Sequence, residues 1–262
     1  MSLKQIEANA LAHFEYLPLK GGYDVAREGG FTLIRCGLGS SMFNIAYGGL
    51  DKGDADSINA KIKSTIDYYA GEPFAWWVPE SAKSPLLTEL FLAQGFLVEA
   101  DEHAMCLTLD SVSQVPFKSM LKVKHVQSKT QLNDFISVVE VYDPAVRPFY
   151  ENLPQGALEG AEQLYIGYTK EGQPVCTAML FVKDESAGIF GVITDARARG
   201  KGLGSAMMAY LLEEAKGQGL KMATLSASSD SGFRIYERLG FKRLGQFACF
   251  EWPGGVGPSG QC

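Results

Sequence analysis

The order of apolar and polar residues along the chain predicts strands alternating with helices. Short apolar runs that are typical of buried strands occur at 31–36, 42–47, 74–78, 97–109, 121–126, 163–169, 175–183, 187–194 and 222–227. Amphipathic runs that are typical of helices occur at 2–19, 57–69, 86–94, 129–141, 143–152, 203–215 and 232–240. The pattern therefore predicts an α/β (α+β) fold, with 97–109 forming either one long strand or a hairpin.

The same series of elements occurs twice. Strand, helix, strand, helix, Gly-Phe and strand follow one another in 42–109 and again in 188–252, and aligning the two Gly-Phe pairs offsets them by 145 residues. We therefore predict two domains, 1–117 and 118–262, joined by a linker at 111–118. The alternative is a chance similarity between common α/β units.

A basic, glycine-rich segment separates the predicted strand 187–194 from the predicted helix 203–215. Three cations and three glycines stand there: Arg197, Arg199, Gly200, Lys201, Gly202 and Gly204. Glycine lets the backbone approach a ligand closely, and the free N–H groups of a helix start attract anions. The segment therefore favours binding of a phosphate or pyrophosphate.

The matching segment of the first repeat, 54–60, has no glycine and begins Asp54-Ala55-Asp56. Aspartates at a helix start cap it themselves and repel a phosphate. We therefore expect the first domain to lack the phosphate site.

The spacing of the glycines distinguishes between the known types of phosphate-binding loop. It fits neither G-x-x-x-x-G-K-[ST] nor G-x-G-x-x-G, but it does fit R-x-x-G-x-G, from Arg197 to Gly202. This resembles the pyrophosphate loop of the GNAT (Gcn5-related) N-acyltransferases. Taken alone, the pattern could equally be a turn that caps an ordinary helix.

A second segment, 232–241, reads GFRIYERLGF and resembles the A-x-x-L-Y-E-x-L-G-F segment that follows the loop in that family. Two motifs in the expected order are more specific than either one, and the resemblance covers about residues 121–252.

The resemblance implies a fold and a reaction. Each domain would be a mixed, mostly antiparallel twisted sheet flanked by helices, the first being a degenerate copy. The protein would be an acetyl-CoA-dependent N-acetyltransferase, without a metal, that acts on a primary amine of a small molecule or peptide. The alternative is a non-catalytic acyl-CoA-binding or regulatory protein.

The resemblance also implies site residues. The strand backbone would pair with the pantetheine arm, the loop amides would hold the pyrophosphate, and Tyr236 would donate a proton to the leaving thiolate, unless it is only a core aromatic. Ser229 stands where the family often has Asn, so it could contact the pantetheine arm or cap a helix. The expected cofactor contacts are Val192, Ile193, Thr194, Arg199, Gly200, Lys201, Gly202, Leu203, Gly204, Ser205 and Ser229.

The general base and the acceptor pocket stay open. Glu140, Asp143, Glu151, Asp195 or a chain of waters could each serve as base, although each carboxylate could equally be a surface charge. The aromatic and acidic residues of 140–151 and 247–252 favour a partly apolar pocket for a cationic amine, unless they only pack between the domains.

Composition and charge argue against several kinds of site and partner. Five scattered cysteines without C-x-x-C, and three scattered histidines (His13, His103 and His125), argue against a metal site or a disulfide framework, and we expect core or surface roles for the histidines. The net charge of −6 argues against nucleic acid as a partner. Residues 1–117 carry a net −7 and residues 118–262 a net +1, so the half with the loop is the one better suited to an anionic ligand.

The first twenty residues do not form a signal peptide, and no apolar run reaches the length of a membrane span. We therefore expect a cytoplasmic protein that does not bind membranes.

Overall fold

The computed structural model describes residues 2–28, 30–50, 53–99, 101–111 and 121–255. Its helices are α1 (Leu3–Lys20), α2 (Ala55–Tyr69), α3 (Pro85–Ala93), α4 (Lys129–Val139), α5 (Val146–Glu151), α6 (Leu203–Gly217) and α7 (Asp230–Arg238). Its strands are β1 (Asp24–Glu28), β2 (Phe31–Arg35), β3 (Asn44–Tyr47), β4 (Phe74–Val78), β5 (Leu97–Val98), β6 (Glu102–Thr108), β7 (Lys122–His125), β8 (Glu162–Tyr168), β9 (Pro174–Lys183), β10 (Ser186–Thr194), β11 (Met222–Ala227) and β12 (Lys242–Trp252). The mixed, mostly antiparallel α/β fold is confirmed.

The elements follow the apolar pattern with two differences. Strand β1 was not predicted, because its sequence DVARE is polar and its side chains are exposed or half-exposed. The run 97–109 forms two separate strands, β5 and β6. The predicted linker lies almost wholly among residues 112–120, outside the described part of the chain.

The chain divides into two compact units whose ends differ from the predicted domains. One unit combines Met1–Leu17 with His103–Gly245, and the other combines Pro18–Glu102 with Gln246–Cys262. Helix α1 and strand β6 thus join the later half, while most of β12 joins the earlier half. Whether 1–117 and 118–262 act as separate functional domains stays a prediction.

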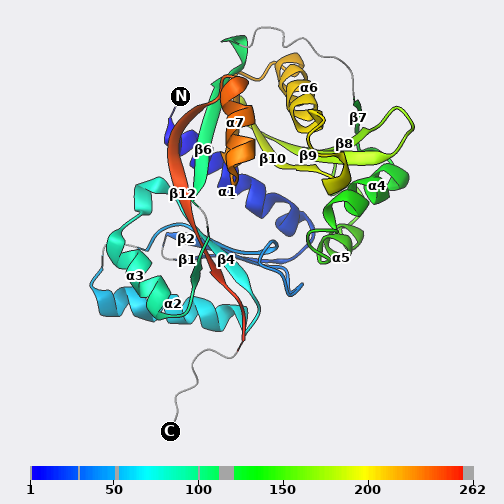
Figure 1. The fold of residues 1–262 in the computed structure, drawn as a ribbon. Helices are drawn as coiled ribbons and strands as arrows, with labels where there is room; N and C mark the ends of the chain where they lie inside the picture. The colour runs from blue at the N-terminus through cyan, green and yellow to red at the C-terminus, as the bar shows by residue number, and fades with distance from the viewer. Residues whose placement is uncertain (1, 29, 51–52, 100, 112–120, 256–262) are drawn as a thin grey trace. The chain divides into compact units, whose positions relative to one another are not determined.

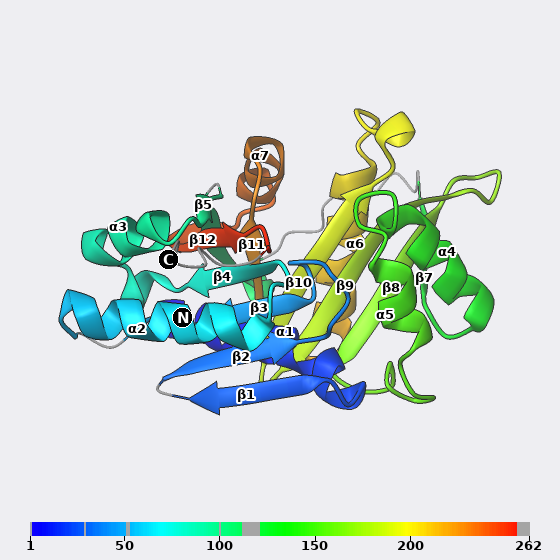
Figure 2. The ribbon, with the colours of Figure 1, turned by 90° about the horizontal axis from the view of Figure 1, so that it is seen from below.

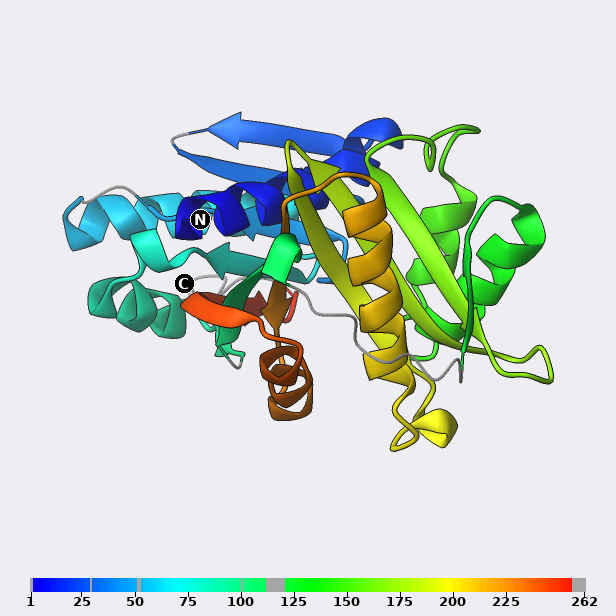
Figure 3. The same ribbon diagram turned by 90° about the horizontal axis from the view of Figure 1, so that it is seen from above.

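The unit that contains the glycine-rich segment is built on a sheet of order β6-β11-β10-β9-β8-β7. Only β10 and β11 run parallel; the other neighbours are antiparallel. Helix α6 covers one face, and α4 and α5 lie against the other (Figures 2 and 3). Leu180 and Ile189 of the sheet, together with Met207 and Leu211 of α6, belong to one buried core on the α6 side.

The other unit has a sheet of order β1-β2-β3-β4-β12, with β5 also pairing to β12. Helices α2 and α3 contact each other (Figure 1). Their apolar residues share a core with Phe74, Trp76 and Phe250 of the sheet. In this unit β3 and β4 form the parallel pair.

Helices α3 and α7 begin 145 residues apart, which is the offset predicted between the two repeats. Helix α3 begins at Pro85 after the N-cap Ser84, and α7 begins at Asp230 after the N-cap Ser229. At the start of α2, the Asp54 carboxylate accepts from the Ser57 N–H at 2.8 Å. The helix start of the first copy is therefore capped by its own acid, and the lack of a phosphate site there stays a prediction.

Among the helices of the described residues, none combines the length and apolar character that crossing a bilayer requires.

Candidate active site

Strand β10 separates from its parallel neighbour partway along. The two strands pair only from Ser186–Met222 to Gly188–Thr224, although β10 continues to Thr194 and β11 to Ala227. On its other side, β10 pairs with β9 with a break in register between Phe190 and Ile193. The backbone of β10 past Gly188 therefore has an edge that β11 does not use, and an extended ligand could pair with it. Val192 and Ile193, the expected contacts of the pantetheine arm, lie on this segment and are half-buried.

The glycine-rich loop connects this edge to the start of α6. Gly200 and Gly202 both have φ of 76°, and a side chain at either would meet no atom within 4 Å. Glycine is thus required there by backbone angle rather than by space. The first bond into the helix runs from the Ala206 N–H to the Gly202 carbonyl, so the amides of residues 203–205 have no carbonyl within the helix. The resulting group of free N–H donors is suited to an anion.

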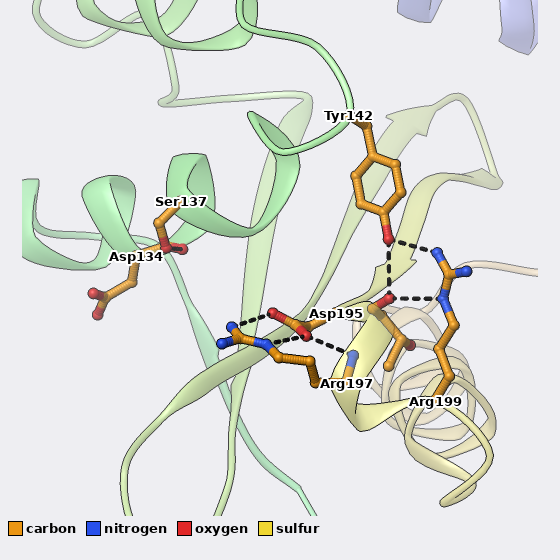
Figure 4. Close-up of polar contacts among 7 residues, drawn as sticks. Asp134, Ser137, Tyr142, Asp195, Arg197 and Arg199 are labelled. Carbon is orange, nitrogen blue, oxygen red and sulfur yellow. Dashed lines mark hydrogen bonds and ion pairs between the residues drawn. The ribbon is translucent and has the colours of Figure 1, made fainter.

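The two arginines of the loop are held by neighbouring groups (Figure 4). Arg197 forms an ion pair with Asp195 at 2.9 Å. Arg199 donates to the Thr194 carbonyl at 3.2 Å and to the Tyr142 hydroxyl, and its guanidinium lies 5.7 Å from the Tyr142 ring centre. Because Tyr142 also donates to the Thr194 carbonyl at 3.3 Å, that carbonyl already has two donors. Lys201 is exposed.

Tyr236 and Ser229 belong to the same short helix, α7. The Tyr236 side chain is half-buried against the core of its unit, 6.0 Å from the Phe241 ring. The Ser229 hydroxyl accepts from the Gly232 N–H at 3.2 Å and so caps the helix. A side chain at Gly232 would lie 3.1 Å from the Ser229 oxygen and 3.7 Å from the Tyr236 oxygen, so both hydroxyls border that glycine.

The carboxylates considered as bases are all engaged locally. Arg147 binds Glu140 through two bonds of 2.7 and 2.8 Å and Glu151 at 3.1 Å. The Arg147 hydrogen bonds hold the pKa of Glu140 below its usual range, and those of Arg197 do the same to the pKa of Asp195. The fourth, Asp143, accepts from the Ala145 N–H at 2.8 Å. A lowered pKa weakens a base, so Glu140 and Asp195 do not stand out for that role.

The aromatic residues expected around the acceptor belong to different units. Phe149 and Tyr150 are buried beside the sheet of the loop-bearing unit, where the Tyr150 hydroxyl contacts the Met179 sulfur at 3.5 Å. Residues 247–252 belong to the other unit.

The sequence did not indicate a partly buried pair in the loop-bearing unit, His13 and Glu162, whose Nδ1 and Oε2 atoms lie 2.9 Å apart. The available signal was the position of His13 in the apolar stripe of the first helix. Within the described residues, no group of three His, Cys, Asp or Glu is placed to hold a metal ion.

Comparison with solved structures shows the same fold. A GCN5-related N-acetyltransferase from Kribbella flavida is similar, with a TM-score of 0.70 and 17% identity over 95% of this chain and 96% of its own. A functionally unknown conserved protein from Staphylococcus epidermidis also has a TM-score of 0.70, at 14% identity over 89% of this chain and 95% of its own. A tandem GNAT protein from the clavulanic acid biosynthesis pathway has a TM-score of 0.52, at 12% identity over 81% of this chain and 76% of its own.

By sequence, no curated protein matches the chain. The family model of the acetyltransferase (GNAT) family matches residues 130–241, which include β10, the glycine-rich loop, α6 and α7. The family transfers acetyl groups from acyl-CoA donors. The chain therefore carries an acetyltransferase domain of the GNAT family at residues 130–241.

Proposed function

We propose that this protein is an N-acetyltransferase that moves the acetyl group of acetyl-CoA to a primary amine of a small molecule or peptide. The observation that carries the proposal is the course of β10. It leaves β11 after Gly188, exposes an unpaired edge, and leads directly into a loop with free amides at the start of α6.

In this proposal, acetyl-CoA lies along that edge. The backbone of Val192, Ile193 and Thr194 pairs with the pantetheine arm. The Thr194 carbonyl already accepts hydrogen bonds from Tyr142 and Arg199. It can therefore bind the pantetheine arm only if those side chains move; otherwise the other backbone groups of this segment bind the arm. The pyrophosphate lies against the loop from Arg199 to Ser205.

The bulge in β10 supplies a donor for the reaction. A bulge leaves backbone groups out of the ladder, so an amide between Phe190 and Ile193 can polarise the thioester carbonyl as its oxygen gains charge. The amine forms the new C–N bond, the C–S bond breaks, and Tyr236 protonates the departing sulfur. Ser229 remains a candidate contact for the pantetheine arm, since a hydroxyl that accepts the cap bond can still donate to a ligand.

The test compares wild type with Tyr236→Phe in two assays. One measures acetyl-CoA binding by calorimetry, and the other follows thiol release with a panel of aliphatic, aromatic and polycationic primary amines and lysine-containing peptides. We expect wild type to bind acetyl-CoA and to turn over at least one class of amine. Tyr236→Phe should bind equally well and turn over about a hundredfold more slowly. Binding without turnover of any amine by wild type would favour the non-catalytic alternative.

A further inference from the structure

The packed side of α1 contains polar side chains as well as apolar ones. Ile6, Ala10 and Leu17 are buried on this face, and Asn9 and His13 lie in the same stripe, one turn apart. Asn9 is 1% exposed and the His13 side chain 13%. Packing alone would require only apolar side chains on this stripe, but it also carries the amide of Asn9 and the imidazole of His13.

The side chain opposite His13 is a buried acid. Glu162, at the start of β8, is 0% exposed, and its Oε2 lies 2.9 Å from His13 Nδ1. As a carboxylate Glu162 only accepts, so Nδ1–H donates to it and the second ring nitrogen, Nε2, is left as a proton acceptor. This is the arrangement in which a buried acid fixes the tautomer of a histidine base.

Three polar atoms in this region lack protein partners. Both amide atoms of Asn9 and the Oε1 of Glu162 are buried without a hydrogen bond among the described residues. Buried polar groups are usually satisfied, and a group left unpaired points to a water or a ligand. The contact between Asn9 and the sheet also depends on a glycine, because a side chain at Gly188 would overlap the Asn9 oxygen.

The cluster lies where β10 leaves β11. Glu162, Phe181 and Gly188 are aligned across β8, β9 and β10, so they share the face of the sheet opposite α6. Gly188 is the last residue of β10 that pairs with β11. The His13 ring stacks on Phe190 at 3.7 Å, and Phe190 directly precedes the bulge in β10. An acceptor that reaches the separated strands from this face would meet His13 and Asn9.

We propose that His13, oriented by Glu162, is the proton acceptor for the acceptor amine, and that Asn9 binds the polar group next to that amine. His13 Nε2 takes one proton from the ammonium form and releases it to solvent. The neutral nitrogen then forms the C–N bond while the C–S bond breaks, and its second proton ends on the departing sulfur. This inference rests on the proposed N-acetyltransferase function.

The test uses full-length His13→Asn, whose amide N–H can still donate to Glu162 but which offers no basic nitrogen. With the amine that wild type uses best, kcat should fall about a hundredfold or more. The acetyl-CoA Kd and the melting temperature should stay close to those of wild type. The matched control is His125→Asn on β7. The His125 ring stacks on Tyr165, which belongs to the core on the α6 side of the sheet, so this histidine is on the opposite face from His13. This control should keep wild-type kcat.

The outcomes separate the two proposals. Turnover by His13→Asn within twofold of wild type overturns the role of His13 and leaves the acetyltransferase function intact. A parallel loss of acetyl-CoA binding also overturns it, because His13 would then support the cofactor site. Absence of turnover in wild type overturns both. Should His13→Asn fail to fold, Glu162→Gln decides: its neutral amide lacks the negative charge that stabilises the protonated His13 ring, so kcat should fall with acetyl-CoA affinity unchanged, and an unchanged kcat overturns the proposal.

Discussion

At the scale of single residues, the partners of the charged side chains decide which of them can do chemistry. The sequence indicated that Glu140, Glu151 and Asp195 were candidate bases, but it could not show that Arg147 and Arg197 bind them. It also indicated only a core or surface role for His13, because the acid that contacts it is 149 residues away along the chain. Such long-range pairs leave no local pattern, whereas loop glycines with a required backbone angle do.

Substituting Arg147→Met tests one of these pairs. Arg147 holds the pKa of Glu140 below its usual range, so the pKa should rise in the variant. A lowered folded-state pKa contributes stability above the unfolded pKa and loses it as the pH falls through the folded value. The variant should therefore be less stable than wild type at pH 7, and the difference should shrink at pH 3. Urea unfolding at both pH values measures it. Because both side chains are about a third exposed, the effect should be small, and an equal difference at both pH values would contradict the assignment.

At the scale of elements, the sequence predicted more. The strand, loop and helix around residue 200 and the helix that carries Tyr236 are where the apolar pattern and the turn residues indicated. Their signals are local: an apolar run, a glycine with positive φ, and a serine N-cap. The separation of β10 from β11 is different. The family resemblance implied that the backbone of β10 pairs with the pantetheine arm, but the apolar pattern does not show which strands pair, because strand pairing depends on residues distant in sequence.

Ser229→Ala separates the two roles considered for that residue. Loss of the cap bond to Gly232 should cost about 0.5–2 kcal/mol of unfolding free energy, measured by urea denaturation. Ser229→Asn is the matched control, because Asn caps as well as Ser and should keep the stability. If Ser229 only caps, the acetyl-CoA Kd stays the same in both variants. If it also binds the pantetheine arm, Ser229→Ala binds more weakly.

At the scale of the whole molecule, each of the two units is built from two segments that are distant in the sequence. The unit with the glycine-rich loop takes α1 and β6 from the first half of the chain. The repeat in the sequence suggested two related parts with a single boundary near 117, and those domains stay a prediction. Contiguous ranges are the simplest inference from a linear repeat, and nothing in the local pattern of β6 specifies β11 as its partner.

Because the loop-bearing unit includes α1 and β6, we predict that a chain starting at residue 118 will not fold. Strand β11 would lose its antiparallel neighbour β6, and the buried residues Met105 and Leu107 would be missing from the core. The sheet face that α1 covers would also lose Ile6 and Leu17. Thermal unfolding followed by circular dichroism should show a cooperative transition for the full chain and none for the fragment. A cooperative transition in the fragment would mean that α1 and β6 are dispensable.

The central claim is that the edge of β10 and the start of α6 bind acetyl-CoA, and calorimetric titration tests it most directly. We predict one site per chain, with affinity at least tenfold weaker in Gly202→Ala, because alanine resists the φ of 76° that points the loop amides at the ligand. Gly217→Ala, at the other end of α6 with open space around it, should bind like wild type. No binding by wild type, or equal affinity in the two variants, would contradict the account.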